Sequence, residues 1–166
     1  MHILINKKNL TYKNYKVKCA IGKRGIKYKK KEGDLVTPIG IYKIKYILFR
    51  KDRIKKIQTK IKKIEIKKNM GWCDDPKSKK YNKLVKLSSL NKCEKLYKKE
   101  NIYDIIIVLD YNMKPVVKNK GSAIFIHVAK KNYNKTKGCV ALKKVHLLRI
   151  IEKLKTNTRV KIEDRK

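Results

Sequence analysis

One histidine and one cysteine in the last third of the chain have the residue types and spacing of a catalytic pair. His127 lies in the apolar run Ser122–Ala129, and Cys139 follows twelve positions later, directly after Gly138. A thiolate is a strong nucleophile, and a nearby imidazole can take the proton of the thiol. Backbone N–H groups around Gly138 and Cys139 would stabilise an oxyanion. The pair therefore predicts acyl transfer, although a lone cysteine or histidine is also an ordinary core residue.

The apolar run that carries His127 has the alternation of a β-strand. In a strand, side chains two positions apart share one face. His127 is then expected to project from the face opposite the bulky aliphatic residues Ile124, Ile126 and Val128. A polar loop, Lys130–Lys137, would lead from this strand to the cysteine.

A helix and a central strand are expected to support this pair. Lys143–Lys155 carries apolar residues at helical spacing, and a helix N-terminus near Cys139 would favour the thiolate. Tyr103–Asp110 is almost continuously aliphatic, as in a strand buried on both faces. Thr37–Gly40 predicts a turn, because proline presets its own φ.

Further strands are expected along the rest of the chain, and His2–Ile5 is interpreted as an edge strand. The other expected strands are Tyr15–Ile21, Ile41–Phe49, Ile61–Ile66 and Thr158–Glu163. Seven or eight strands and one main helix predict a mainly β fold, and the length of 166 residues predicts a single domain, 1–166.

The motifs around the pair resemble those of the L,D-transpeptidase catalytic domains, the YkuD-type family that cross-links peptidoglycan. The segment SAIFIHVA at Ser122–Ala129 and the segment TKGCVAL at Thr136–Leu142 are similar to the catalytic stretch of one branch of that family. EGDLVTPIGIYKI at Glu32–Ile44 is similar to its G-D-x-x-T-P element. The further similar segments, in order, are Phe49–Arg53, Gly71–Pro76, Tyr81–Asn82, Tyr103–Asn112 and Pro115–Val117.

The resemblance implies a fold and a reaction. The fold would be a YkuD-type β-sandwich with one main C-terminal helix after the catalytic cysteine. Cys139 would attack a peptide carbonyl, and His127 would act first as the general base and then as the acid. The donor would be a peptidoglycan tetrapeptide stem, cut after its third residue with loss of D-alanine, and the acyl group would pass to an amine or to water. No metal or organic cofactor is implied.

The chain departs from the wider family at one position of this motif. Most members carry a histidine directly before Gly-Cys, whereas this chain has Lys137 between Thr136 and Gly138. We expect His127 alone to serve as the base. Lys137 would then favour the thiolate or contact a substrate carboxylate, unless it is an exposed loop lysine with no role.

Several residues outside the pair are candidates for binding substrate. Asp74, beside the only tryptophan, Trp72, would recognise an amine-bearing substrate with the indole as a stacking wall. The alternative is a turn before Pro76 in which the carboxylate accepts backbone N–H groups. Tyr111 and Asn112 end the predicted central strand, where a simple strand-to-turn transition also explains them. Thr136 and Lys137 complete this set.

Composition bounds the other functional classes. The formal net charge of +35 favours attraction to polyanions, although the lysine, isoleucine and asparagine usage also fits a base bias of the genome. Arginine, the better reader of bases and phosphates, is scarce, which counts against specific nucleic-acid binding. A hydrolase with the same Cys/His site and a basic polyanion-binding module remain as alternatives. We expect a monomer whose partners are stem peptides.

The cysteine pattern and the N-terminus carry less information. None of Cys19, Cys73, Cys93 and Cys139 forms a C-x-x-C pair, so we expect no zinc site. No signal peptide is visible, and no apolar run approaches the length of a transmembrane span. The chemistry implied by the resemblance belongs to the cell envelope or periplasm, so the sequence leaves the location open.

Overall fold

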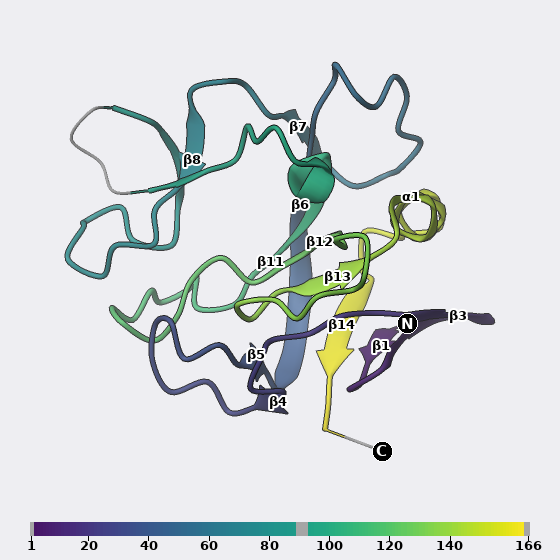
Figure 1. Cartoon of the computed structure of the whole chain (residues 1–166), viewed down its shortest axis with the longest axis horizontal. Coiled ribbons are helices and arrows are strands. Elements are labelled where there is room, and N and C mark those ends of the chain that lie inside the picture. The colour runs from purple at the N-terminus through teal and green to yellow at the C-terminus, as the bar shows by residue number, and fades with distance from the viewer. Residues whose placement is uncertain (1, 89–92, 165–166) are drawn as a thin grey trace.

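The main sheet of the protein joins strands from both ends of the chain (Figure 1). The computed structural model describes residues 2–88 and 93–164 and is mainly β. The order within the nine-stranded sheet is β13-β12-β11-β6-β14-β1-β2-β3, and β7 also pairs with β6. Its strands are β1 (His2–Ile5), β2 (Asn9–Tyr12), β3 (Tyr15–Lys18), β6 (Gly40–Phe49), β7 (Lys63–Glu65), β11 (Ile105–Leu109), β12 (Phe125–Val128), β13 (Val140–Leu142) and β14 (Arg159–Ile162).

Two smaller sheets and two helical segments complete the described elements. A three-stranded sheet has the order β10-β8-β9, and a two-stranded sheet pairs β4 with β5. Their bounds are β4 (Ile26–Lys27), β5 (Thr37–Pro38), β8 (Met70–Trp72), β9 (Leu84–Lys86) and β10 (Glu94–Lys95). The 3-10 helix η1 covers Asn101–Tyr103, and the α-helix α1 covers Lys144–Glu152.

Strand β11 separates two apolar cores. All five of its residues are buried, which confirms the prediction of a central strand buried on both faces. Ile105 and Ile107 pack into the first core, whereas Ile106 and Val108 pack into the second. Because successive side chains of a strand point to opposite faces, one aliphatic run can supply both cores.

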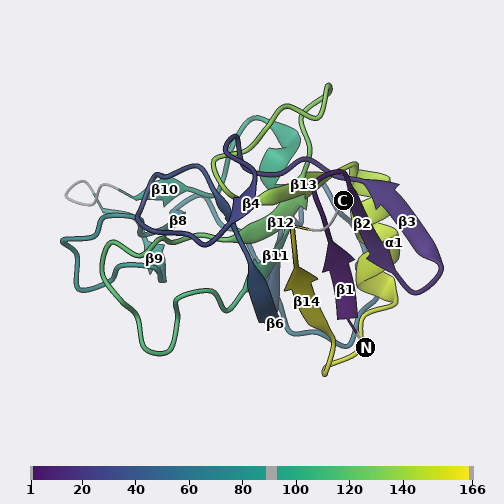
Figure 2. The ribbon, with the colours of Figure 1, turned by 90° about the horizontal axis from the view of Figure 1, so that it is seen from below.

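The two cores are covered by different elements (Figure 2). Helix α1 contributes Leu147, Ile150 and Ile151 to the first core. The second core contains Trp72 of β8 and Phe125 of β12. Figure 2 shows β8, β9 and β10 on one side of the molecule and α1 on the other. This mainly β architecture with one helix near the C-terminus agrees with the fold expected from the sequence.

Three local expectations are wrong, each for a reason of tertiary pairing. Strand β1 is paired on both sides, with β14 and with β2, so it is not an edge strand. Thr37 and Pro38 form β5, which pairs in parallel with Ile26–Lys27, instead of a turn. Helix α1 starts at Lys144, after β13, so its N-terminus does not lie at Cys139. The helix therefore does not stabilise a thiolate there.

Candidate active site

The pairing of β12 with β13 brings His127 and Cys139 to one face of the sheet. The two strands are parallel, and His127 is the register partner of Ala141. Cys139 is two residues before Ala141, so its side chain projects from the same face as His127 and occupies a diagonal position. The half-buried Cys139 packs against the second core, which also contains Phe125. The expectation that His127 points away from the aliphatic face of its strand agrees with this placement.

The imidazole of His127 is held in one tautomer by its own backbone. Its Nδ1 lies 2.9 Å from the carbonyl oxygen of Val128. A carbonyl can only accept a hydrogen bond, so Nδ1 carries the proton and Nε2 keeps its lone pair. Burial lowers the pKa of His127 below its usual 6.5, and this effect outweighs the hydrogen bond to Val128. The ring is therefore a neutral base at neutral pH.

Tyr103 and Glu94 support the imidazole from the side of the second core, and sequence reasoning missed both. The Tyr103 ring meets the His127 ring edge to face, with centroids 5.4 Å apart. The Tyr103 hydroxyl donates to the Glu94 carboxylate at 2.9 Å. The negative charge of Glu94 raises the pKa of His127, against the larger effect of burial. The only sequence feature that could have indicated Glu94 is that acidic residues are rare in this lysine-rich chain.

The Cys139 thiol is neutral in this setting. Its Sγ donates to the carbonyl oxygen of Ala123 at 3.1 Å. Burial raises the pKa of Cys139 to about 12, although a backbone hydrogen bond from Phe125 and the charge of Lys29 act in the opposite direction. Of the two roles expected for the imidazole, this raised pKa favours proton removal from a neutral thiol, because burial outweighs the local charges. The site therefore combines a neutral thiol and a neutral imidazole on one face of the sheet.

The turn before the cysteine is closed by Thr136. The Thr136 hydroxyl donates to the carbonyl oxygen of Cys139 at 2.6 Å and accepts from the Gly138 N–H at 3.1 Å. Gly138 has φ of +141°, and a Cβ there would lie 2.9 Å from the carbonyl oxygen of Val36. Glycine is therefore required at this position both for its backbone conformation and for close packing. The role of Thr136 in the structure is to shape the turn.

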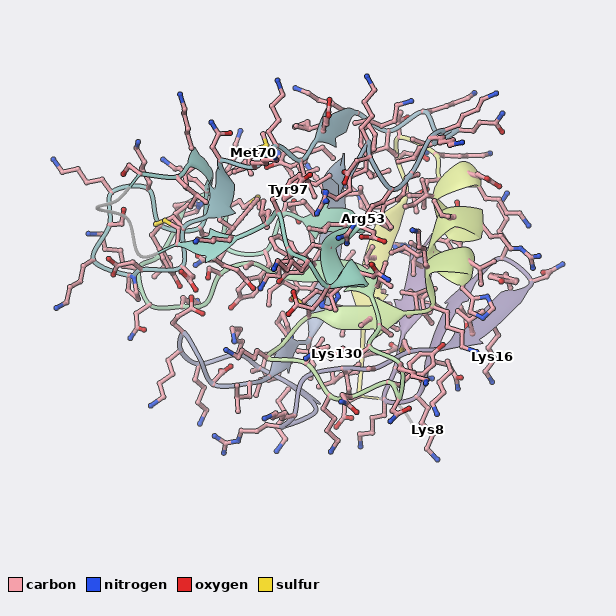
Figure 3. The ribbon with its side chains drawn as sticks, turned by 45° about the horizontal axis from the view of Figure 1, so that its top comes forward. Lys8, Lys16, Arg53, Met70, Tyr97 and Lys130 are labelled. Carbon is pink, nitrogen blue, oxygen red and sulfur yellow. The ribbon has the colours of Figure 1, made fainter. Side chains whose placement is uncertain are left out.

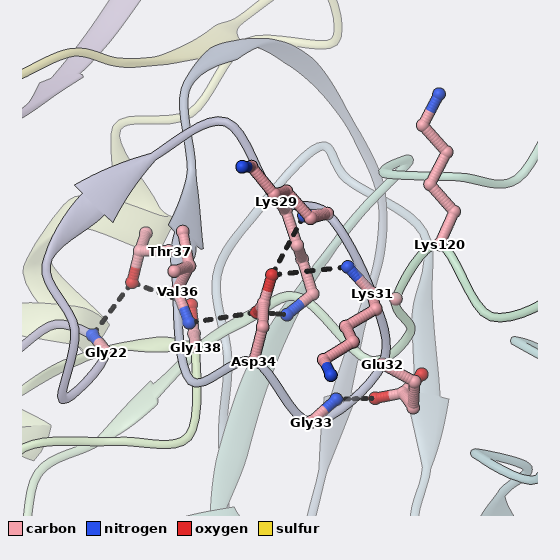
Figure 4. Close-up of polar contacts among 12 residues, drawn as sticks. Gly22, Lys29, Lys31, Glu32, Gly33, Asp34, Val36, Thr37, Lys120 and Gly138 are labelled. Carbon is pink, nitrogen blue, oxygen red and sulfur yellow. Dashed lines mark hydrogen bonds and ion pairs between the residues drawn. The ribbon is translucent and has the colours of Figure 1, made fainter.

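A second threonine joins the turn to the N-terminal part of the chain (Figure 4). The Thr37 hydroxyl accepts from the Gly22 N–H at 2.8 Å and donates to the Gly138 carbonyl oxygen at 2.8 Å. Gly22 also forms a β-bridge with Thr136. Thr37 is completely buried, so both of these bonds are shielded from water. This contact explains the chemical need for threonine in the T-P-x-G element.

A buried ion pair organises the loop between β4 and β5 (Figure 4). The Lys29 ammonium donates to Asp34, and both side chains are almost fully buried. Asp34 also accepts the backbone N–H groups of Lys30 and Val36. Hydrogen bonds and the charge of Lys29 lower the pKa of Asp34, although burial acts in the opposite direction. The pair thus fixes the carbonyl of Val36 against Gly138.

A family model places the chain among known proteins. The model of the L,D-transpeptidase catalytic domain, YkuD, matches residues 1–162. The chain belongs to the L,D-transpeptidase (YkuD) family. Its members are enzymes that act on peptidoglycan peptides. No curated protein matches the chain.

Trp72 of this L,D-transpeptidase-family chain is a core residue. Its side chain is only 1% exposed, and its ring meets Phe125 edge to face. Its Nε1 donates to Asn82 at 3.0 Å. The interpretation of Trp72 as a stacking wall for substrate is therefore corrected, because an indole buried in the second core has no free face.

Asn82 and Asn112 organise the chain around Ala123, just before β12. Asn82 accepts the Ala123 N–H and donates to the carbonyl oxygens of Tyr111 and Asn112. The Asn112 amide bonds the backbone of Val117 in both directions, which closes the loop after β11. The Tyr111 hydroxyl donates to the carbonyl oxygen of Lys120 at 2.6 Å. The structure thus gives Tyr111 and Asn112 the strand-to-turn role.

Asp74 and Lys137 remain exposed. The pKa of Asp74 is raised, first by partial burial and then by Glu94, Glu32 and Asp75. Acidic side chains therefore gather around Asp74 in a strongly basic protein. Asp74 remains a candidate to bind a substrate amine. No structural role explains the exposed Lys137.

Two hollows lie on the surface outside the candidate site. One hollow of about 260 Å³ opens over the loop that carries the Lys29–Asp34 pair, and another of about 500 Å³ opens beside Val128. Neither is lined by Cys139 or His127. Within residues 2–88 and 93–164, no group of three or more His, Cys, Asp or Glu side chains is placed to hold a metal ion. In the same part of the chain no helix has the length and apolarity to cross a bilayer.

Proposed function

We propose that the chain is a cysteine acyltransferase that acts on peptidoglycan stem peptides through a thioacyl-enzyme. The observation that carries this proposal is that His127 of β12 and Cys139, directly before β13, lie on one face of the sheet, with His127 Nδ1–H bound to the carbonyl of Val128. Family membership supports the substrate class. A general base on Nε2 beside a thiol is the arrangement that acyl transfer requires.

The first half-reaction starts from two neutral groups. As Sγ of Cys139 attacks the carbonyl carbon, Nε2 of His127 takes the thiol proton, so no free thiolate is needed. The carbonyl π electrons move to oxygen and form the oxyanion. The Gly138 N–H already donates to Thr136, so we assign the Cys139 N–H as the oxyanion donor of the two backbone groups considered. Collapse of the intermediate breaks the C–N bond, and His127 gives its proton to the leaving amine.

The charge around His127 favours this proton relay. The imidazole becomes positively charged only during the reaction, and the Glu94 carboxylate under Tyr103 stabilises that charge. Because the interaction is stronger in the protonated state than in the resting state, it lowers the barrier. Glu94 acts through its neighbours and is a positioning residue.

The second half-reaction transfers the acyl group to an amine or to water. His127 would deprotonate the incoming nucleophile, which attacks the thioester carbon and releases Cys139. The acidic residues near Asp74 would attract a protonated amine to this face. The alternative product, a shortened stem peptide from hydrolysis, uses the same residues, so the geometry supports both an acyltransferase and an L,D-carboxypeptidase.

The test is acylation followed by product analysis. The protein is incubated with a tetrapeptide stem or with a carbapenem, and intact mass spectrometry follows the adduct. We expect one adduct, which peptide mapping locates on Cys139. With an amine acceptor present, a cross-linked peptide indicates transfer and a free tripeptide indicates hydrolysis. An adduct on Cys19, Cys73 or Cys93 in place of Cys139 would contradict the proposal.

A further inference from the structure

Two cysteines outside the proposed active site, Cys73 and Cys93, face each other across the small sheet that covers the second core. The antiparallel ladder of β8 and β10 pairs Trp72 with Glu94. The next residue outward on each strand is a cysteine. The same register therefore places Cys73 directly opposite Cys93.

The hydrogen bonds of Cys73 show which kind of cross-strand pair this is. Its N–H donates to the Lys83 carbonyl oxygen at 2.9 Å, and its carbonyl oxygen accepts from the Asn82 N–H at 2.7 Å. Both backbone groups thus point away from Cys93, toward the chain that leads into β9. Opposed residues in such a non-hydrogen-bonded pair have Cα atoms about 4.5 Å apart. A disulfide requires a Cα separation of roughly 4.4–6.8 Å.

The side chains agree with the backbone. All four cysteines are free thiols in the structure. The pKa of Cys93 is raised to about 11, first by burial and then by the neighbouring Cys73 thiol, in agreement with the pairing register. Cys73 is 2% exposed, whereas Cys93 is only half-buried. An oxidant therefore reaches Cys93 first, and Cys73 is placed to resolve the resulting mixed disulfide.

We propose that Cys73 and Cys93 form a reversible cross-strand disulfide. The oxidant is a disulfide of low molecular weight or of a partner protein. The Cys93 thiolate attacks one sulfur of the oxidant and releases the first thiol. Cys73 then attacks Cys93 Sγ and releases the second. Each cysteine loses one proton, the new S–S bond replaces the bond of the oxidant, and the oxidant leaves as two thiols.

The bridge connects directly to the residue that supports His127. Glu94 follows Cys93 in the chain, and its carboxylate accepts the Tyr103 hydroxyl. A covalent link between β8 and β10 would hold this carboxylate in place. This consequence for activity rests on the proposed function, whereas formation of the bridge does not.

The test of the bridge measures disulfide formation without measuring activity. The Cys139→Ala chain is used, because the half-buried Cys139 would compete for the oxidant. It is equilibrated with oxidised glutathione, quenched with iodoacetamide and mapped by mass spectrometry without reduction. We expect a linked peptide that contains Cys73 and Cys93, lighter by two hydrogen atoms than its parts, while Cys19 is recovered as an alkylated thiol.

Matched variants and a stability measurement complete the experiment. Addition of Cys93→Ser should abolish the linked peptide and leave Cys73 as a thiol, whereas addition of Cys19→Ser should leave the link unchanged. Oxidation should raise Tm by roughly 5–10 °C, reversed by dithiothreitol, as expected for a closed loop of this size. A stable glutathione adduct on Cys93 with Cys73 still reduced, a link to Cys19, or no link at any glutathione ratio would overturn the proposal.

Discussion

At the scale of single residues, the proposed reaction depends on one imidazole nitrogen. His127 uses Nδ1 to bind the Val128 carbonyl, so Nε2 is the only ring atom that can accept a proton from Cys139. Burial keeps both groups neutral at rest. Because His127 supplies the base in the proposed reaction, a histidine directly before Gly-Cys is not needed. Lys137 occupies that position and is exposed.

Three substitutions test this assignment. Cys139→Ala should abolish acylation by the tetrapeptide or the carbapenem. His127→Ala should slow it by about a hundredfold or more, the usual contribution of a positioned acid–base group. Lys137→Ala should change the rate by less than about threefold, as for an exposed residue with no proton to take. Intact mass spectrometry over time gives the rates. An inactive Lys137→Ala beside an active His127→Ala would reverse the roles.

The pH dependence of acylation reports the same nitrogen. Only the neutral imidazole accepts a proton, and burial holds the pKa of His127 below 6.5. The active form therefore persists above that lowered pKa, and the rate should fall only as the pH drops through it. Glu94→Gln removes a charge that raises this pKa, so its acidic limb should lie at still lower pH and its rate should fall several-fold. An acidic limb above pH 7 in the wild type, or one that does not move in Glu94→Gln, would contradict this account.

At the scale of elements, the turn that carries Cys139, the proposed nucleophile, is held by segments distant in the sequence. The chain around Ala20 forms a bridge with Ala141, and Gly22 forms another with Thr136. Thr37 links Gly22 to Gly138. The position of Cys139 thus depends on the N-terminal part of the chain as much as on β13.

Two arginines of the Phe49–Arg53 motif hold the segment that presents Tyr103. Arg50 stacks on the Tyr97 ring at 3.3 Å and donates to the Lys98 carbonyl oxygen. Arg53 donates to Asp104, which also accepts Lys144 of α1. The carboxylate of Asp104 is 1% exposed, so these two cations compensate a buried charge. The motif therefore holds the segment of Tyr103, whose ring contacts the His127 imidazole.

Removal of the Thr37 hydroxyl tests the turn. Thr37→Val leaves the Gly22 N–H and the Gly138 carbonyl without a partner in a buried place, at a cost of about 1–3 kcal/mol in the free energy of unfolding. Acylation should slow as well, because the nucleophile is displaced. Thr37→Ser, which keeps the hydroxyl, is the matched control and should retain most of both properties. Denaturant unfolding and the acylation rate are the measurements, and a Thr37→Val chain equal to Thr37→Ser in both would disprove this role.

At the scale of the whole molecule, the lysines are distributed over the surface. The formal net charge is +35, and Figure 3 shows basic side chains that project from every visible side. The acidic residues around Asp74, among them Glu32, Asp75 and Glu94, form the exception. A spread of single positive charges attracts polyanions but does not read their sequence.

Nucleic-acid binding should therefore be weak and independent of sequence. Fluorescence anisotropy with duplexes of different sequence should give equal affinities, and the affinity should fall steeply between about 50 and 200 mM salt. Aspartate-rich peptide serves as a control polyanion and should show the same trend. A salt-resistant complex with one sequence would favour the binding-module alternative over an enzyme.

The sequence alone determined the family, the mainly β fold with one late helix, and the His127–Cys139 pair. These follow from alternation along Ser122–Ala129, from the aliphatic run of β11 and from the motif residues, all of which are local patterns. Local patterns also limited the predictions. They assigned a turn to Thr37–Pro38, because the partner strand at Ile26–Lys27 is set by tertiary pairing.

Only the tertiary structure decided the protonation states of Cys139 and His127, the contacts of Tyr103 and Glu94, and the burial of Trp72. A pKa depends on burial and on charges from distant segments, so spacing could not show that Cys139 is a neutral thiol. Tyr103 of η1 meets the His127 ring, and Glu94 of β10 reaches the Tyr103 hydroxyl, only because η1 and β10 pack on the second core. The same covering buries Trp72 and sets Cys73 opposite Cys93, since strand register fixes which side chains meet.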